Sequence, residues 1–448
     1  MGPHSLAERH ASPDHYLVGR PAAWFAFAMT LGLMIFDYVD RQVIVSLFPY
    51  LKSEWGLSDK QLGSLVSVVS VVVAIGALPI ALLADRSSRV KSIVVMATAW
   101  SLATIACIFT RNYSQLFAAR ALVGLGEAGY GSVGAALIAS LFPARMRGAL
   151  LAAFFAAASV GSVLGVLLGG LIAARWGWQA AFGVVGAPGL LLALLYLKVR
   201  DYKTVELTPP LEKAARSTGS AAWYAAKALI RSRTLLWVCL AGAAQLIVVS
   251  AVWAWLPSYL NRVHGMAPGE AGVKAALVVL CGAVGSVVWG AVVDRAGNGR
   301  PRVRLYAMAA LCVLTLAVLV PTFSLPLAAS TQFALIALAG FLMTCTVGPV
   351  SAVVTDVVHP GVRATGLSVL ALFQNLFGLA AGPFIAGVLS DAYGLESALS
   401  IIPAFGLLAA LCFMLAARNY VADMHQVQDV RVRIDDAGPA PAPQAAAS

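Results

Sequence analysis

The sequence predicts an all-α membrane protein with twelve transmembrane helices, arranged as two pseudo-symmetric six-helix bundles. Three observations predict this class. Of the 448 residues, 60% are hydrophobic and 11% are charged, whereas soluble domains carry roughly 25% charged residues. Apolar runs recur along the chain, and many reach the roughly 20 residues that a helix needs to cross a bilayer. Two short motifs also recur about half a chain apart, an Asp-Arg pair at 85–86 and 294–295 and a basic, Pro-containing loop at 142–148 and 359–366, which is typical of transporters built from repeats.

The apolar runs predict helices rather than barrel strands, because they are continuous and do not alternate. Run length places the spans at 22–46, 60–84, 92–109, 114–141, 148–174, 180–198, 235–260, 272–293, 304–321, 330–355, 365–390 and 397–417. No short apolar core with a cleavage site precedes the first span, so we expect that span to be retained.

The longest interior polar stretch lies between the sixth and seventh spans and contains Pro209-Pro210. It divides the chain into a cytoplasmic N-terminal segment 1–21, a bundle 22–198, a cytoplasmic linker 199–234, a bundle 235–417 and a cytoplasmic tail 418–448. The tail ends in an Ala/Pro-rich run with little apolar bulk, so we expect it to be disordered.

The distribution of basic residues predicts the orientation. Most of the 31 Lys and Arg residues lie in the termini, the linker and the loops on the same side. Cytoplasmic loops hold such an excess, so both termini are predicted to be cytoplasmic, in a multi-pass protein of the plasma (bacterial inner) membrane. The same bias accounts for the net charge of +11 without a nucleic-acid partner.

No metal or other cofactor is expected. The six cysteines fall inside predicted spans without a CxxC pair, and the six histidines fall in loops or tails. The expected partners are therefore the lipid bilayer, a small-molecule substrate and protons, for a chain that acts as a monomer.

The first repeated motif is an Asp-Arg pair at the end of the second and eighth spans. Such an acid can accept hydrogen bonds from a helix N-terminus, while the arginines pair with nearby acids. Ordinary positive-inside charge is the alternative, but the second copy favours a latch. The predicted gating residues are Asp85, Arg86, Arg89, Asp294 and Arg295.

The fourth span contains two ionisable residues, Arg120 and Glu127, in a run that includes a literal GxGxxG. No strand precedes this run and no acid follows at the spacing of a ribose ligand, so we reject dinucleotide binding. Ionisable residues inside a span are costly unless paired, and they indicate a transport pathway. Seven residues apart, the two side chains share one helix face.

The first span offers Asp40 and Arg41, with Asp37 and Tyr38 one turn earlier. Burial favours the neutral form of a carboxyl group, whereas a guanidinium favours the charged form. That conflict suits a proton-coupled switch, although a static ion pair that fixes helix packing is the alternative. No comparable acid or base lies mid-span in the second half, so we expect ion coupling in the first half.

Polar and aromatic residues inside the spans are candidates for substrate binding. In the outer part of the seventh span, Trp253 lies among other aromatic residues that form either an interfacial belt or a wall for an amphipathic substrate. The predicted substrate-binding residues are Arg41, Arg120, Tyr130, Trp253, Gln374 and Asn375.

Glycines recur at four-residue spacing in the fifth span and at similar spacing in the eleventh. Small residues at this spacing let helices approach closely in lipid. Helix packing is the main interpretation, and a sliding surface between the halves is its functional extension. The residues are Gly161, Gly165, Gly169, Gly378, Gly382 and Gly387.

Over most of residues 20–420, the chain resembles the major facilitator superfamily and, within it, the Spinster-like branch. The motifs that carry the resemblance are Tyr38-Val39-Asp40-Arg41, Gly56-Leu57-Ser58-Asp59, Leu83-Ala84-Asp85-Arg86 and the run from Arg120 to Tyr130. The resemblance implies a proton-driven carrier with alternating access, in which Asp40, Arg120 and Glu127 couple protonation to conformation. Spinster-like members are associated with lysolipids, sphingoid lipids and other amphiphiles.

The chain also departs from the family pattern. Ala81 and Ser88 stand where glycine is usual, and Ser140 stands where an acid is often found, whereas Asp356 occupies the equivalent place in the second half. We therefore expect a weaker latch in the first half.

The sequence thus predicts a secondary active transporter, proton-coupled through Asp40, Glu127 and Arg120, that moves an amphipathic or lipid-like small molecule. One alternative is a proton-coupled importer of small organic anions such as sugar acids or aromatic carboxylates, although only Arg41 and Arg120 offer cationic groups in the spans. Another is a non-transporting receptor, in which both acids could be neutralised without loss of function. An enzyme is disfavoured, because the spans show no histidine and no nucleophile–base pair.

Overall fold

The computed structural model describes residues 16–201, 232–298, 300–358 and 363–428, and the regular structure of these ranges is helical. The first half consists of α1 (Arg20–Val43), η3 (Ile44–Leu47), α2 (Phe48–Trp55), α3 (Asp59–Arg86), α4 (Arg89–Ala106), η4 (Cys107–Phe109), α5 (Tyr113–Glu127), α6 (Tyr130–Leu141), α7 (Ala144–Trp176) and α8 (Trp178–Tyr196). The second half consists of α11 (Arg233–His264), α12 (Pro268–Ala296), α13 (Pro301–Ser324), α14 (Ala329–Met343), α15 (Val347–Val357), α16 (Arg363–Phe373), η6 (Gln374–Leu379), α17 (Ala381–Tyr393), α18 (Leu395–Ile401), η7 (Ile402–Ala404) and α19 (Phe405–Gln428).

The predicted class and span number are confirmed: within the described residues, 12 helical segments are long and apolar enough to cross a membrane. Helix α19 continues to Gln428, so the chain beyond the predicted boundary at 417 is still helical there. The predicted N-terminal segment, linker and tail otherwise lie largely outside the described residues.

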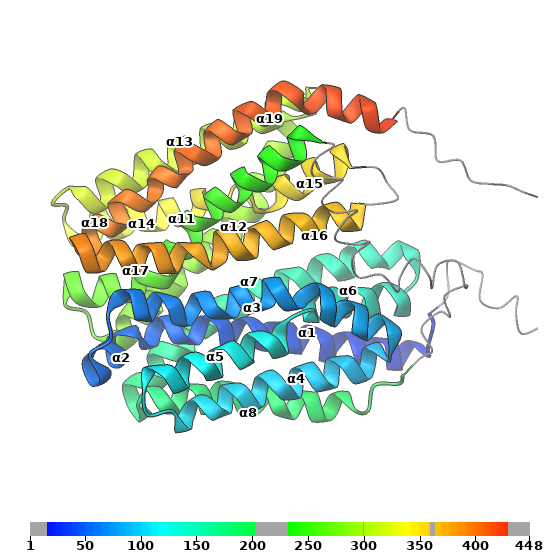
Figure 1. Ribbon diagram of the computed structural model, residues 1–448, viewed down its shortest axis with the longest axis horizontal. Coiled ribbons are helices and arrows are strands. Elements are labelled where there is room, and N and C mark those ends of the chain that lie inside the picture. The colour runs from blue at the N-terminus through cyan, green and yellow to red at the C-terminus, as the bar shows by residue number, and fades with distance from the viewer. Residues whose placement is uncertain (1–15, 202–231, 299, 359–362, 429–448) are drawn as a thin grey trace, which may run out of the picture.

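The two halves lie side by side, with α1 to α8 in one body and α11 to α19 in the other (Figure 1). The start of α1 and the end of α19 lie at the same end of the molecule, which we call the termini end; α2 and α18 lie at the opposite, far end (Figure 1). An even number of spans requires this arrangement.

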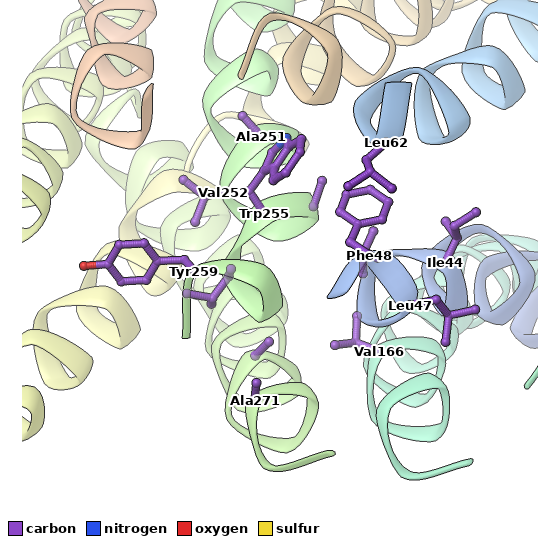
Figure 2. Packing of buried hydrophobic residues seen from close by; sticks show 14 of the residues in the cluster. Ile44, Leu47, Phe48, Leu62, Val166, Ala251, Val252, Trp255, Tyr259 and Ala271 are labelled. Atoms are coloured by element: carbon purple, nitrogen blue, oxygen red, sulfur yellow. The ribbon is translucent and has the colours of Figure 1, made fainter. Parts of the chain in front are cut away.

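The halves pack against each other through a buried apolar cluster at the far end. In this cluster, Phe48 of α2 faces Trp255 of α11, with ring centroids 5.1 Å apart (Figure 2). Val166 of α7 and Ala271 of α12 belong to the same cluster. Because lipid is as apolar as these side chains, such contacts hold by close packing rather than by exclusion of water.

The glycines of the fifth span serve packing within the first half. A Cβ added at Gly165 would lie 2.7 Å from the carbonyl oxygen of Val39, and one at Gly169 would lie 2.7 Å from that of Val43. This row therefore seats α7 on α1, and it is not a sliding surface between the halves. On α7 the close approach to the other half falls one residue later, at Gly170, where an added Cβ would lie 3.2 Å from the Cα of Gly272. In the eleventh span, Gly387 lies against the backbone of Asp59 in the other half.

Candidate functional site

Five ionisable residues form a buried cluster in the first half. Helix α1 supplies Asp37, Asp40 and Arg41, and helix α5 supplies Arg120 and Glu127. Arg120 is 0% exposed and Glu127 is 2% exposed, whereas the Arg41 side chain retains 15% exposure. Arg41 is thus the cation of this cluster that a molecule entering from solution can reach.

Glu127 pairs with Arg41. The Nε atom of Arg41 lies 2.9 Å from Oε2 of Glu127, and its Nη2 atom lies 3.7 Å from Oδ1 of Asp37. The guanidinium also lies over the ring of Tyr38, 5.2 Å from its centroid. The prediction named Arg120 as the partner of Glu127, but in this conformation Glu127 forms an ion pair with Arg41 of α1 rather than with Arg120 of its own helix.

Arg120 instead binds backbone carbonyls at the end of α1. Its Nη1 donates to the carbonyl of Asp40 at 2.9 Å, its Nη2 to that of Arg41 at 3.5 Å, and its Nε to that of Leu65 at 3.4 Å. Just beyond these residues α1 passes into the 3-10 turn at Ile44, and carbonyls at a helix C-terminus lack partners and carry partial negative charge. Arg120 therefore caps α1 and ties it to α3.

The Asp40 carboxyl group has a different environment. Thr104 of α4 donates to its Oδ2 atom at 3.1 Å, and its Oδ1 atom is buried without a hydrogen-bond partner. Thr104 escaped the sequence reasoning because a threonine in an apolar span more often bonds to its own helix. Only the tertiary structure, which brings Thr104 of α4 to the carboxyl group of Asp40 on α1, gives it this role.

The glycines of the GxGxxG pattern serve helix packing. A Cβ added at Gly124 would lie 2.8 Å from the carbonyl oxygen of Val69 on α3, and one at Gly126 would lie 2.5 Å from the backbone nitrogen of Trp100 on α4. Gly129 has φ of +87° and separates α5 from α6, a conformation that glycine adopts at little cost. These glycines bring α5 close enough for its charged residues to reach α1.

The predicted substrate-binding residues lie in different environments. Tyr130 is 0% exposed, donates from its hydroxyl to the carbonyl of Thr30 at 2.6 Å, and packs edge-on against Trp100. In this conformation Tyr130 and Arg120 offer no surface to a substrate. Gln374 and Asn375 are partly exposed in η6.

Trp253 on α11 is also partly exposed. Its ring lies against Gly282 of α12, where an added Cβ would come within 2.9 Å of Cζ2. Its indole nitrogen is buried without a hydrogen-bond partner. The ring therefore belongs to the packing between two helices of the second half.

The termini end carries an ion-pair network in the second half. Arg304 of α13 donates from Nη1 to Oδ2 of Asp356 at 2.9 Å, and its Nε atom lies 3.5 Å from Oδ1 of Asp294. Tyr420 of α19 donates to the same Asp356 oxygen at 2.7 Å. The prediction named Asp294 but missed Arg304 and Tyr420, and it named Arg295, which is exposed.

The corresponding place in the first half has a neutral partner. Arg89 of α4 donates from Nη1 to the hydroxyl of Ser140 at 3.0 Å. The side chains of Asp85 and Arg86 lie outside the described residues. A serine in place of an acid makes this contact a hydrogen bond to a neutral hydroxyl, whereas the equivalent acid of the second half, Asp356, accepts from Arg304.

A second ion-pair network joins the two halves at the far end, and we call it the far-end clasp: Lys52, Asp59, Arg262, Ser390 and Asp391. Asp59, at the start of α3, accepts from Arg262 of α11 at 2.6 and 2.9 Å and from Ser390 of α17 at 2.5 Å, and it pairs with Lys52 at 2.5 Å. The carboxylate of Asp391 accepts from the backbone N–H groups of Asp59 and Lys60, each at 2.8 Å. Each half thus supplies a carboxylate that binds the other.

Within the described residues, no group of three or more His, Cys, Asp or Glu side chains is placed to hold a metal ion. The buried carboxyl groups of the first half lie instead beside guanidinium groups and hydroxyl donors. Arginine side chains and hydrogen bonds thus offset the cost of burying these carboxyl groups.

Comparison with known proteins gives the family. The family model described as Major Facilitator Superfamily matches residues 30–381. An MFS-type efflux pump of Mycolicibacterium smegmatis is 29% identical over 91% of this chain and 95% of its own length. A gallate transporter of Pseudomonas putida is 29% identical over 88% of this chain and 93% of its own length. Protein spinster homolog 3 of Danio rerio is 25% identical over 91% of this chain and 87% of its own length.

A solved structure matches the fold. The crystal structure of a bacterial homologue of the human lysosomal transporter Spinster, in an inward-facing and unoccupied conformation, has a TM-score of 0.81 at 22% identity. The match covers 91% of this chain and 99% of that one. The chain therefore belongs to the Major Facilitator Superfamily, a superfamily of transporters rather than enzymes, and its similarity extends to the spinster proteins.

Proposed function

We propose that this protein is a proton-coupled secondary active transporter that moves an amphipathic molecule bearing an anionic group, by alternating access and as a monomer. The observation that carries the proposal is the composition of the buried cluster, which contains three carboxyl groups and two guanidinium groups.

The cluster has one carboxyl group more than it has cations. If Asp37, Asp40 and Glu127 were all ionised, the cluster would carry a net negative charge in the membrane interior, where an uncompensated charge is costly. One bound proton makes the cluster neutral. Glu127 and Asp37 lie 2.9 and 3.7 Å from nitrogen atoms of the Arg41 guanidinium, whereas the carboxyl group of Asp40 accepts from the hydroxyl of Thr104. We therefore assign the proton to Asp40 in this conformation.

Arg41 links the substrate to the proton. An anionic headgroup can form the same paired hydrogen bonds with a guanidinium as a carboxylate does, so a bound substrate competes with Glu127 for Arg41. Displaced Glu127 would be a buried charge without a partner, and it takes up a proton. Substrate binding and protonation then favour each other, as thermodynamic linkage requires.

The far-end clasp supports a conformation that is closed at the far end and open toward the termini end. The fold match to an inward-facing Spinster homologue supports the same assignment, with the termini end facing the cytoplasm of a bacterial inner membrane.

Small organic anions are the second candidate substrates. The gallate transporter of Pseudomonas putida and a probable 4-methylmuconolactone transporter of Cupriavidus pinatubonensis, 30% identical over 68% of this chain, are among the relatives. A carboxylate of either class could bind Arg41, so the cluster alone does not separate them. Both substrate classes carry an anionic group that Arg41 can bind, and they differ in the size of the apolar part of the substrate.

The test is proton flux in proteoliposomes that contain the purified protein and an internal pH dye. We would add lysolipids, sphingoid bases, gallate and sugar acids in turn, and compare the wild type with Glu127→Gln. The matched control is Glu54→Gln, because Glu54 lies outside the cluster and accepts from the indole N–H of Trp178 at 2.6 Å, which a glutamine oxygen can still do.

We expect substrate-dependent proton movement in the wild type and in Glu54→Gln, and a loss of at least about tenfold in Glu127→Gln. The compound that elicits proton flux identifies the chemical class of the substrate. Equal substrate transport in all three proteins would overturn the proton-coupling proposal, and absence of transport of every compound would favour the non-transporting receptor.

A further inference from the structure

The eleventh span is broken at a place where the two halves touch. Helix α16 passes into the π turn η6 (Gln374–Leu379), which is followed by α17, and the N–H of Ala380 donates to the carbonyl of Asn375 at 2.9 Å, five residues back. The fifth span, its counterpart in the first half, is the uninterrupted α7 of 33 residues. Isolated π turns inside helices recur at functional positions.

Pro383 adds to the break. Proline has no N–H, so it cannot donate to the carbonyl four residues earlier, and its ring crowds that carbonyl. In this span the carbonyl belongs to Leu379, the last residue of η6. The π turn and the proline thus weaken the same point of the helix.

Side chains from two neighbouring helices supply hydrogen bonds to this weakened backbone. On α11, in the same half, Ser250 donates to the carbonyl of Gly378 at 3.0 Å and Trp255 donates to that of Pro383 at 3.0 Å. On α3, in the opposite half, Ser67 donates to the carbonyl of Ala380 at 2.5 Å. Two of these donors stay with α17 if the halves separate, whereas Ser67 leaves.

We propose that the π turn Gln374–Leu379 is a hinge at which α16 bends relative to α17 and α11, and that the Ser67 hydroxyl holds the bend while the far end is closed. This inference rests on the alternating access proposed above, but not on protons or on the identity of the substrate. Opening of the far end parts α3 from α17 and removes the Ser67 bond. The hinge then lets α16 move separately from the rest of its own half.

The test is a distance measurement within the second half, between spin labels at Leu372→Cys on α16 and Leu236→Cys on α11, which are 42% and 38% exposed. Of the six native cysteines, five are buried, and the partly exposed Cys281 would be replaced by serine. The distances would be recorded by pulsed electron paramagnetic resonance with the clasp intact and after its release by Arg262→Gln.

If the π turn is a hinge, Arg262→Gln should produce a second population of distances between the two labels when the eleventh span is otherwise unchanged. Pro383→Ala restores a donor for Leu379 and should remove most of that population, whereas the same change in a helix away from the seam, Pro321→Ala on α13, should leave it unchanged. A single distance in every variant would overturn the hinge, because α16 and α11 would then move as one rigid body.

Ser67→Ala tests the role of the hydroxyl. The loss of one neutral hydrogen bond should raise the ratio of the second population to the first roughly fivefold. Ser64→Ala is the matched control, because Ser64 lies one turn earlier on α3 and bonds to Tyr113 of its own half at 2.7 Å. An equal ratio in the two serine variants would overturn the assignment of Ser67. Proton flux, measured separately on the same proteins, distinguishes failure of the hinge from failure of the proposed transport function.

Discussion

At the scale of single residues, burial separates groups that can act on a substrate from groups that hold the helices. Arg41 and Arg120 are both arginines inside spans, yet Arg41 keeps part of its side chain exposed and pairs with Glu127, whereas Arg120 is fully buried on backbone carbonyls. Arg120 satisfies three acceptors that a lysine could not reach together, because the guanidinium presents its donors in a fixed fork. Its role is thus to position Asp40 and Arg41.

Tyr130 gives a prediction at this scale. In Tyr130→Phe the ring still packs on Trp100, but the hydrogen bond to the carbonyl of Thr30 is lost. We expect a loss of about 1 kcal/mol in stability, seen as a lower thermal unfolding midpoint in detergent, with transport unchanged. The control is Tyr306→Phe, whose ring is 48% exposed. An increased KM for substrate in Tyr130→Phe would instead show that the Tyr130 hydroxyl takes part in substrate binding.

At the scale of helices, the charged cluster depends on how closely α5 approaches its neighbours. Gly124 seats α5 on α3, Gly126 seats it on α4, and Gly129 ends it beside the glutamate. Of the three glycines of the GxGxxG pattern, Gly124 and Gly126 are therefore packing positions on two sides of α5, and Gly129 forms the turn between α5 and α6. The close approach also places Thr104 of α4 within reach of Asp40.

Gly126→Ala tests this packing. The added methyl group would lie 2.5 Å from a backbone atom of Trp100, and backbone cannot move aside as a flexible side chain can, so we expect a destabilisation of about 1–3 kcal/mol. Gly131→Ala on the next helix is the control, because an added Cβ there meets nothing within 4 Å. Thermal unfolding of both variants is the measurement. Equal midpoints would show that α4 and α5 are not in close contact.

At the scale of the whole molecule, the two ends of the protein differ in what the ion pairs join. The network of Arg304 connects helices within the second half, whereas the far-end clasp connects the two halves. The clasp is partly exposed at Arg262, with 24% of its side chain accessible, and almost fully buried at Asp59. Burial of the acid makes the loss of its partner costly, because hydrogen bonds to charged groups are the stronger ones.

Arg262→Gln should therefore shift the protein toward a conformation that is open at the far end, by roughly tenfold or more in the ratio of the two states. The measurement is the rate at which a membrane-impermeant maleimide modifies Leu62→Cys, a residue at the buried seam beside Phe48 (Figure 2). Lys274→Gln is the control, because Lys274 pairs with Glu270 on its own helix. If both variants react at the wild-type rate, the clasp does not hold the far end closed.

The sequence by itself determined the helical membrane class, the number of spans, the two halves and the residues that carry charge inside the spans. These properties are local: the length of an apolar run decides whether a helix can span lipid, and an ionisable residue in such a run is costly wherever its helix packs. The family resemblance carried by the motifs around Asp40 and Glu127 was likewise readable from short segments, and the family match confirms it at the level of the superfamily.

The tertiary structure decided which charged groups meet. The pairing of Glu127 with Arg41, the bond from Thr104 to Asp40 and the clasp at Asp59 each join segments whose relative rotation no local pattern specifies. The π turn in the eleventh span depends on packing in the same way, because a carbonyl within it accepts from Ser250 of α11 and the carbonyl just after it accepts from Ser67 of α3. The apolar pattern assigns residues to the membrane, but the close contacts between helices select the partner of each polar group.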